Sequence, residues 1–339
     1  MSRVGNCEGV RVSNAGGGSS PAVAAVEHEG LLDLYGQMVR IRAFEDEMQR
    51  LFLRGEIHGT VHLYTGQEAC SVGVCSALSA GDRVAATYRG HGAALAMGTE
   101  PRALAAELMG RSTGVCGGRA GSMNVIDLDH GLIGCFGIVG GSIAAATGAG
   151  LSLQRTGGVA VAFFGDGATN HGYFHECLNF ARVRRLPVVF VCENNLYGEF
   201  TPMASVTAGG DIRARAAGYD MPAEKVDGND VELVRAAARE AVDHARRGDG
   251  PAFLECLTYS HLGHSKTDPG AYRADGELET WMARDPLTVA SERLAQAGMP
   301  ADEITGREAA VRSDVQAGVA LAVADPYPDP GDPAAEYAQ

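Results

Sequence analysis

The sequence is poor in positive charge, and the shortage is greatest for lysine. Among 339 residues only Lys225 and Lys266 are lysines, and 42 acidic residues outnumber 28 lysines and arginines, which gives a formal net charge of −14. Nucleic-acid-binding proteins usually present a basic face to the phosphate backbone. The charge balance therefore predicts that this protein does not bind nucleic acid.

Zinc-ligand patterns and membrane-spanning runs are also missing. The eight cysteines are scattered, with no Cys-x-x-Cys and no His/Cys ligand spacing, so we expect buried thiols in a reducing cytoplasm. No apolar run is long enough to cross a membrane. Residues 1–28 are rich in glycine and serine near 16–20 and have no hydrophobic signal core, so they are expected to form a disordered tail. We therefore expect a cytoplasmic protein without a membrane anchor.

The residues that are present alternate between helical and strand patterns. From Glu29 to Arg54 apolar residues recur at three- and four-residue steps, which predicts an amphipathic helix. Apolar runs predict strands over residues 84–87, 158–164, 187–192 and 252–258. Further helices are predicted over 67–78, 101–109, 142–153, 173–182, 213–217 and 230–246. Such alternation is typical of a doubly wound α/β fold with a mainly parallel sheet.

The segments without clear periodicity are assigned by composition. Residues 110–142 are dense in glycine and are predicted to be irregular backbone that wraps a ligand. Residues 259–280 are rich in Gly, Asp, Ser and His and are predicted to form a mobile active-site loop. Residues 281–339 are predicted to be a helical C-terminal extension. We expect residues 29–339 to form a single α/β domain.

Two motifs at consecutive predicted strand ends carry the strongest functional signal. Gly165-Asp166-Gly167 follows the first of these strands, and Asn194-Asn195 follows the next. One strand–helix–strand unit separates them, so the two parallel strands should place a carboxylate and an amide oxygen side by side. Such oxygen ligands suit Mg²⁺ or Ca²⁺, and Mg²⁺ usually combines few carboxylates with phosphate oxygens. The motifs therefore predict a site for a metal-bound diphosphate.

The same motifs carry a family resemblance. Residues 165–170 (Gly-Asp-Gly-Ala-Thr-Asn) and 193–198 (Glu-Asn-Asn-Leu-Tyr-Gly) resemble the thiamine-diphosphate motif of the decarboxylating component of 2-oxo acid dehydrogenases. More narrowly, they resemble the alpha subunit of the two-chain type, as in pyruvate and acetoin dehydrogenases. Further matching segments follow in order at 62–69, 87–92, 121–123, 137–140, 263–269 and 325–330. The resemblance extends from about residue 30 to the end of the chain.

The resemblance implies roles for individual residues. Three residues are implied to bind Mg²⁺: Asp166, Asn195 and, through its carbonyl group, Tyr197. Thiamine diphosphate is implied to contact ten residues: Tyr88, Arg89, Gly137, Val139, Gly165, Asp166, Gly167, Ala168, Asn195 and His264. The implied catalytic histidines are His62 and His264, of which His264 would reach the diphosphate.

Four positions depart from the pattern of this family. Thr60 stands where the family has phenylalanine, Ser260 where it has arginine, and Asn124 where it has histidine. Glu199 stands where a hydrophobic residue often borders the substrate pocket. Thr60 and Glu199 together predict a more polar or cationic donor pocket than pyruvate needs.

The resemblance also implies a reaction and a partner. The chain is expected to decarboxylate or cleave a 2-oxo substrate such as pyruvate or acetoin and to pass the acyl unit to a lipoyl-bearing acyltransferase or another acyl carrier. No glutamate of this chain is a candidate for the carboxylate that activates the cofactor. In the family the beta subunit supplies it, so an α₂β₂ heterotetramer is expected.

Three alternatives remain open. One keeps the cofactor but uses a ketose-type donor or transfers the acyl unit to a carrier protein, and the departures at 60, 199 and 260 motivate it. Another is a non-catalytic scaffold for the beta subunit, which the intact Asp166, Asn195 and Arg89 disfavour. The last is a nucleotide-binding module, which the missing Gly-x-Gly-x-x-Gly after the first strand disfavours.

Overall fold

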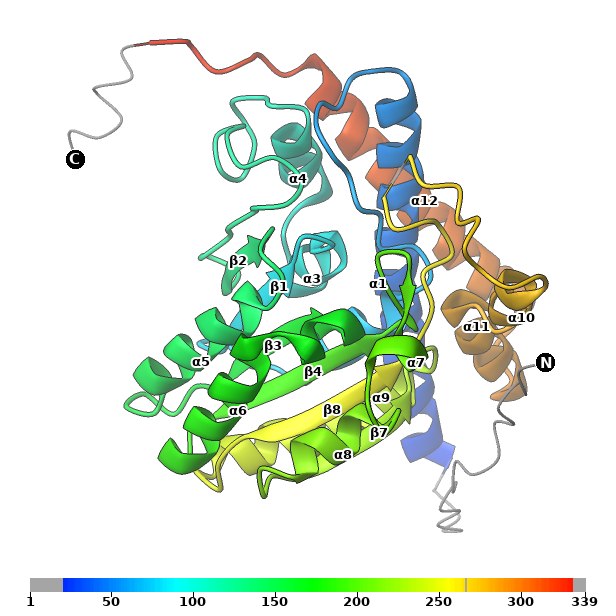
Figure 1. Cartoon of the computed structure of the whole chain (residues 1–339). Coiled ribbons are helices and arrows are strands. Elements are labelled where there is room, and N and C mark those ends of the chain that lie inside the picture. Colours follow the sequence, from blue (N-terminus) through cyan, green and yellow to red (C-terminus); the bar gives the residue numbers. More distant parts are fainter. Residues whose placement is uncertain (1–20, 266, 332–339) are drawn as a thin grey trace.

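The fold is built around one parallel β-sheet (Figure 1). The computed structural model describes residues 21–265 and 267–331, so residues 1–20 of the predicted tail lie outside the described part. Six strands pair in the order β2-β1-β3-β4-β8-β7, and every pair is parallel. The strands are β1 (Arg83–Thr87), β2 (Leu132–Phe136), β3 (Ala160–Gly165), β4 (Val188–Asn194), β7 (Ala223–Asp227) and β8 (Ala252–Leu257). The predicted α/β fold with a mainly parallel sheet is confirmed.

Helices cover both faces of the sheet because its central strands are apolar on both sides. On β3, Val161 and Phe163 belong to one hydrophobic cluster, whereas Ala162 and Phe164 belong to the other. The second cluster is completed by α5 (Gly141–Leu153), α6 (Gly172–Arg184) and α8 (Ile212–Ala217). The first is completed by α1 (Pro21–Leu53), α2 (Glu68–Cys75), α3 (His91–Met97), α4 (Pro101–Leu108), α9 (Val231–Arg246), α11 (Pro286–Gln296) and α12 (Ala301–Ala324).

The first and the last helix of the described residues pack together on one side of the sheet. The long helix α12 packs along α1 and against α4, and Figure 1 shows α1 and α12 running beside each other. Together with α10 (Glu277–Met282) and α11, α12 makes the C-terminal region helical over most of its described length. Within residues 21–265 and 267–331, none of the helices combines the length and apolar character that crossing a membrane requires.

Several elements differ from the sequence prediction. Helix α1 begins at Pro21, so the predicted disordered tail is wrong for residues 21–28, where a proline followed by an alanine-rich stretch favours the start of a helix. β2 lies inside the glycine-rich segment that was predicted to be irregular. The sequence analysis missed this strand because it is only five residues long and contains a glycine. β7 was missed because its sequence, Ala-Glu-Lys-Val-Asp, is mostly polar at the edge of the sheet. The seven-residue α3 was also missed, since it is too short for a helical period to stand out.

The glycine-rich segment after α4 wraps around a carboxylate of the protein itself. Glu107 is fully buried, and its two oxygens accept hydrogen bonds from four main-chain N–H groups at 2.7–3.3 Å, those of residues 116, 118, 120 and 121. A Cβ atom at Gly114 would lie 2.4 Å from Glu107 Oε2. The glycines thus allow the main chain to approach the carboxylate closely.

Replacing Glu107 should loosen this segment. Glu107→Ala leaves four N–H groups without their acceptor, so we expect the free energy of unfolding to fall by about 3 kcal/mol. Glu107→Gln keeps one acceptor oxygen and should cost about half of that. Urea unfolding measures the change in stability, and hydrogen exchange should rise over residues 110–121.

Glu100→Ala is the matched control. Glu100 stands just before α4 and pairs with Arg40 at the surface, with 69% of its side chain exposed, so its loss should cost less than about 1 kcal/mol. If Glu107→Ala were as mild as this control, the carboxylate would not organise the segment.

Candidate active site

A cavity of about 610 Å³ opens at the carboxyl ends of the central strands. β1 and β3 are neighbours, but the chain continues from β1 to β2 on one side and from β3 to β4 on the other. In doubly wound sheets, ligands bind in the crevice at such a switch point. The cavity is lined by the ends of β1, β3 and β4, by the turn before α5 and by parts of residues 260–273.

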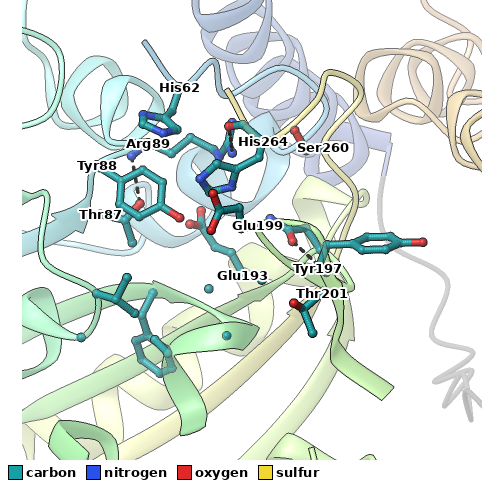
Figure 2. A pocket seen from close by; sticks show the side chains of 18 of the residues that line it. His62, Thr87, Tyr88, Arg89, Glu193, Tyr197, Glu199, Thr201, Ser260 and His264 are labelled. Carbon is teal, nitrogen blue, oxygen red and sulfur yellow. Dashed lines mark hydrogen bonds between the residues drawn. The ribbon is translucent and has the colours of Figure 1, made fainter. Parts of the chain in front are cut away.

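Most of the residues predicted for the site lie together around this cavity. Those that line it are His62, Tyr88, Arg89, Gly137, Val139, Gly165, Gly167, Ala168, Asn195, Tyr197, Glu199 and His264. Asp166 is buried beside them at the end of β3. Thr60 is exposed and does not line the cavity. Figure 2 shows the side chains of His62, Tyr88, Arg89, Glu193, Glu199 and His264 directed toward one common space.

Three oxygen atoms face one another at the ends of β3 and β4. The Asn195 amide presents one atom 2.9 Å from the Tyr197 carbonyl oxygen and 3.3 Å from Asp166 Oδ1. When that atom is Oδ1, the Nδ2 group of Asn195 points the other way and donates to Gln67 Oε1 at 3.2 Å. The oxygens of Asn195, Asp166 and Tyr197 then face one another. Neighbouring ligands of an octahedral Mg²⁺ ion with bonds of 2.0–2.1 Å lie about 3 Å apart. The two distances from the Asn195 atom therefore fit neighbouring ligands of a hydrated or phosphate-bound magnesium ion.

The buried carboxylate of Asp166 lacks a compensating charge. It is 1% exposed, and its Oδ2 atom has no hydrogen-bond partner among the described residues. Burial raises the pKa of Asp166 to about 7. A cation beside the carboxylate would offset the lost hydration and keep it ionised.

This oxygen set does not match the usual composition of protein metal clusters. No group of three or more His, Cys, Asp or Glu side chains able to hold a metal occurs in the described part of the chain. One carboxylate, one amide and one carbonyl leave half of an octahedron open. Mg²⁺ commonly fills such positions with water and substrate phosphates, and the residues present fit that arrangement.

A tight turn after β4 presents the Tyr197 carbonyl. Leu196 has a φ of 76°, a left-handed conformation that is uncommon for leucine. Its N–H group donates to Asn194 Oδ1 at 3.2 Å, and its carbonyl accepts from Met203 N–H at 2.8 Å. β5 (Tyr197–Gly198) then pairs with β6 (Thr201–Pro202) in a small hairpin.

A buried carboxylate on β8 supports this turn from below. Glu255 is fully buried and accepts from Asn194 Nδ2 at 2.8 Å, from Arg213 N–H at 3.0 Å and from Lys225 Nζ at 2.9 Å. Asn194 therefore links Glu255 to the left-handed Leu196. The first asparagine of the pair holds the turn, and the second faces the cavity.

The glycines predicted to contact the diphosphate lie where two stretches of main chain meet. The 3₁₀ helix η1 (Asp166–Asn170) starts directly at the end of β3. A Cβ atom on Gly167 would lie 3.2 Å from the Cα of Gly198 in the hairpin. N–H groups at such a helical start can approach anions closely, and a larger side chain would press the hairpin away.

Arg89 contributes positive charge to the cavity wall. It is 8% exposed and donates to two main-chain carbonyl groups, of Leu63 and, at 2.7 Å, of His264. No carboxylate in the described part of the chain forms an ion pair with Arg89. An anionic group in the cavity would meet this charge.

Two histidines and a tyrosine form an aromatic group next to Arg89. The ring of His62 lies 4.5 Å from that of Tyr88 and 5.1 Å from that of His264. Burial and the neighbouring Arg89 lower the pKa of His62 to about 3 and also lower that of His264. Both imidazoles are therefore neutral at pH 7 in this arrangement. Their catalytic roles stay predictions.

The loop over residues 259–280 is held by two charged side chains. Arg273 donates to the carbonyl groups of Ser260, His261 and Leu262. Asp268 accepts from the N–H groups of residues 264 and 270 at 2.6 and 2.8 Å. These bonds bring His264 to the cavity, and the predicted mobility of the loop stays a prediction.

Three cavity residues were missed by the sequence analysis. Glu193 is buried, accepts a hydrogen bond from the hydroxyl group of Tyr64, and has its pKa raised to about 7 by burial. Gln67 and Arg273 also line the cavity. Glu193 and Gln67 stand in matching segments and could have been proposed, whereas Arg273 lies in an irregular segment with no local signal.

Comparison with known proteins agrees with this geometry. The model of the dehydrogenase E1 component family matches residues 36–331. The alpha subunit of acetoin:2,6-dichlorophenolindophenol oxidoreductase from Bacillus subtilis is 42% identical, and the match covers 90% of this chain and 92% of that relative. The pyruvate dehydrogenase E1 component subunit alpha of Rhizobium meliloti is 40% identical over 91% of this chain and 89% of the relative.

A plant relative shows the same similarity. The chloroplastic pyruvate dehydrogenase E1 component subunit alpha-3 of Oryza sativa subsp. japonica is 40% identical, with 92% of this chain and 77% of the relative covered. All three relatives are named as alpha subunits, which implies a beta subunit as partner, and the family implies the use of thiamine diphosphate. From the switch-point cavity, its oxygen cluster and these matches, we conclude that the chain belongs to the dehydrogenase E1 component family.

Proposed function

We propose that this chain binds the Mg²⁺ complex of thiamine diphosphate and acts as the alpha subunit of a 2-oxo acid or acetoin dehydrogenase. The observation that carries the proposal is the set of facing oxygens on Asp166, Asn195 and Tyr197, beside an arginine that has no carboxylate partner among the described residues. The first feature suits a divalent cation, and the second suits the diphosphate that the cation would share.

Each group of cavity residues has a distinct task in this proposal. Asp166, Asn195 and the Tyr197 carbonyl would bind Mg²⁺. Arg89, His264 and the N–H groups of Gly167 and Ala168 would contact the diphosphate. Bound thiamine diphosphate supplies a nucleophilic carbon and an electron sink for breaking the bond next to the donor carbonyl. Gly137 and Val139 would contact the ring system of the cofactor. Tyr88 would contact the cofactor near its diphosphate.

The beta subunit would complete the site. At the rim of the cavity, Ile138 and Val139 are 70% and 46% exposed, which is unusual for two consecutive apolar side chains. We propose that the beta subunit covers this rim in an α₂β₂ heterotetramer and supplies the carboxylate that activates the cofactor. A lipoyl-bearing acyltransferase or another acyl carrier would accept the acyl unit. The cytoplasmic location stays a prediction.

Loss of Asp166 should abolish cofactor binding. In Asp166→Ala the only carboxylate of the oxygen set is missing, so the affinity for thiamine diphosphate with Mg²⁺ should fall by at least about 100-fold, more than is typical for losing an outer-shell residue. The measurement is calorimetric titration of the chain co-expressed with its beta subunit.

Asp314→Ala, an exposed aspartate on α12, should bind like the unaltered complex. Affinity in Asp166→Ala within threefold of that control would contradict the metal assignment. Failure of a well-folded unaltered complex to bind the cofactor would leave the scaffold hypothesis as the better explanation.

A second candidate function rests on Glu199. This residue lines the cavity with a φ of 56°, and within the described part of the chain no cationic side chain forms an ion pair with it. A carboxylate on the wall opposes an anionic donor and favours a neutral or polar one. The alternative is therefore the same cofactor chemistry on a ketose-type donor, with acyl transfer to a carrier protein. Absence of ketose turnover beside turnover of pyruvate or acetoin would exclude it.

Glu199→Gln should shift the preference among donors. Removing the negative charge should raise kcat/KM for pyruvate relative to neutral acetoin by about tenfold, the effect of a charge several ångströms away in partly screened surroundings. Steady-state kinetics of the α/β complex on both donors measure the ratio. Glu303→Gln, an exposed glutamate on α12, should leave the ratio unchanged, and an equal ratio in both variants would remove Glu199 from donor selection.

A further inference from the structure

Gln67 is a fully buried glutamine that touches both the cavity and a predicted metal ligand. It stands just before α2, and its side chain is 0% exposed while lining the cavity. Its Oε1 atom accepts a hydrogen bond from Asn195 Nδ2 at 3.2 Å. Its Nε2 atom has no hydrogen-bond partner among the described residues.

The Asn195 amide can be placed in either of two orientations, and they differ in which atom faces Asp166 and Tyr197. In one, Oδ1 faces the Tyr197 carbonyl and Asp166 Oδ1, and Nδ2 donates to Gln67. In the other, Nδ2 donates to the Tyr197 carbonyl at 2.9 Å and to Asp166 Oδ1 at 3.3 Å. Only the first orientation offers three oxygens to a cation, because the second places two hydrogens among them.

The orientation of Gln67 is tied to that of Asn195. When Asn195 turns Nδ2 toward Asp166, its Oδ1 comes to lie 3.2 Å from the Gln67 atom that was the acceptor. Two oxygens at that distance repel, so Gln67 must also rotate and offer Nε2 as a donor. The two amides therefore change together, and an acceptor oxygen of Gln67 is compatible only with the cation-binding orientation of Asn195.

We propose that Gln67 is a positioning residue that sets the Asn195 amide for cation binding. Its Oε1 atom accepts Asn195 Nδ2–H and so directs Asn195 Oδ1 toward the site shared with Asp166 and Tyr197. This orientation leaves Gln67 Nε2 free to donate to a water or phosphate oxygen bound with the cation. The inference rests on the proposed function, because it requires that a divalent cation bind at these oxygens.

Matched variants at position 67 separate the acceptor from the volume of the side chain. Gln67→Met keeps a similar length without acceptor or donor, whereas Gln67→Glu keeps an acceptor toward Asn195. In the α/β complex with thiamine diphosphate, the dissociation constant of Mn²⁺ is measured from the spin-resonance signal of free Mn²⁺. Outer-shell partners of metal ligands typically contribute 10–100-fold in affinity, so Gln67→Met should weaken Mn²⁺ binding by about tenfold or more.

The other variants should behave differently. Gln67→Glu should bind Mn²⁺ at least as tightly as the unaltered complex. For Gln67→Met, the Mg²⁺ concentration giving half-maximal activity should rise while kcat at saturating Mg²⁺ stays within about threefold. Gln316→Met, an exposed glutamine on α12, is the control for the substitution itself and should match the unaltered complex.

A second background tests whether Gln67 acts through Asn195. In Asn195→Asp both terminal atoms of the side chain are oxygens. An oxygen therefore faces the proposed cation whichever way the carboxylate is turned, and Gln67 no longer needs to set its orientation. In that background Gln67→Met should change Mn²⁺ affinity by less than twofold, a result that a general loss of packing would not produce. An equal loss in both backgrounds, or Mn²⁺ affinity of Gln67→Met within twofold of the unaltered complex, would overturn the inference. Failure of the unaltered complex to bind Mn²⁺ would overturn the proposed function as well.

Discussion

The oxygens of Asp166, Asn195 and Tyr197 impose the main electrostatic constraint on this molecule. The Asn195 atom lies 2.9 Å from the Tyr197 carbonyl oxygen and 3.3 Å from Asp166 Oδ1, and burial of the Asp166 carboxylate strengthens the repulsion between these oxygens. Either a proton or an amide hydrogen must lie among them, or a cation must. Burial raises the pKa of Asp166 to about 7 and so favours its protonated form, whereas the oxygen set of a glycine-flanked carboxylate, an amide and a carbonyl would suit a cation. The remaining structure near the cavity holds these atoms in place.

That support comes from buried polar groups rather than from the hydrophobic core. Glu255 fixes Asn194, and Asn194 fixes the left-handed Leu196 that precedes the Tyr197 carbonyl. A non-glycine residue with positive φ persists only where its surroundings determine it, and here a fully buried carboxylate with three donors does so. The two asparagines therefore have different roles: Asn194 maintains the turn, and Asn195 faces the cavity.

The sequence predicts the parts of the site that depend on strand order and little of what depends on side-chain orientation. Asp166 and Asn195 could be placed together because parallel strands end at a common edge. Gln67 stands in a matching segment, but its contact with Asn195 joins residues 128 positions apart and could not be predicted. Arg273 lies within an aperiodic loop that gives no local signal. Glycine density was also ambiguous: over 110–121 it serves the carboxylate of Glu107, whereas over 137–140 it borders the cavity. Composition alone does not distinguish a ligand from a buried side chain.

The charges around the cavity are consistent with the proposal that a cation binds together with the diphosphate. The charged side chains that line it are Arg89 and Arg273 on one side and Glu193 and Glu199 on the other. The guanidinium group of Arg273 donates to three carbonyl groups of its own loop. His62 and His264 are neutral because their pKa values are lowered. Arg89 alone cannot balance a diphosphate that also faces Asp166. A divalent cation held by Asp166, as proposed above, would supply the missing charge, so we expect cofactor binding and cation binding to be coupled.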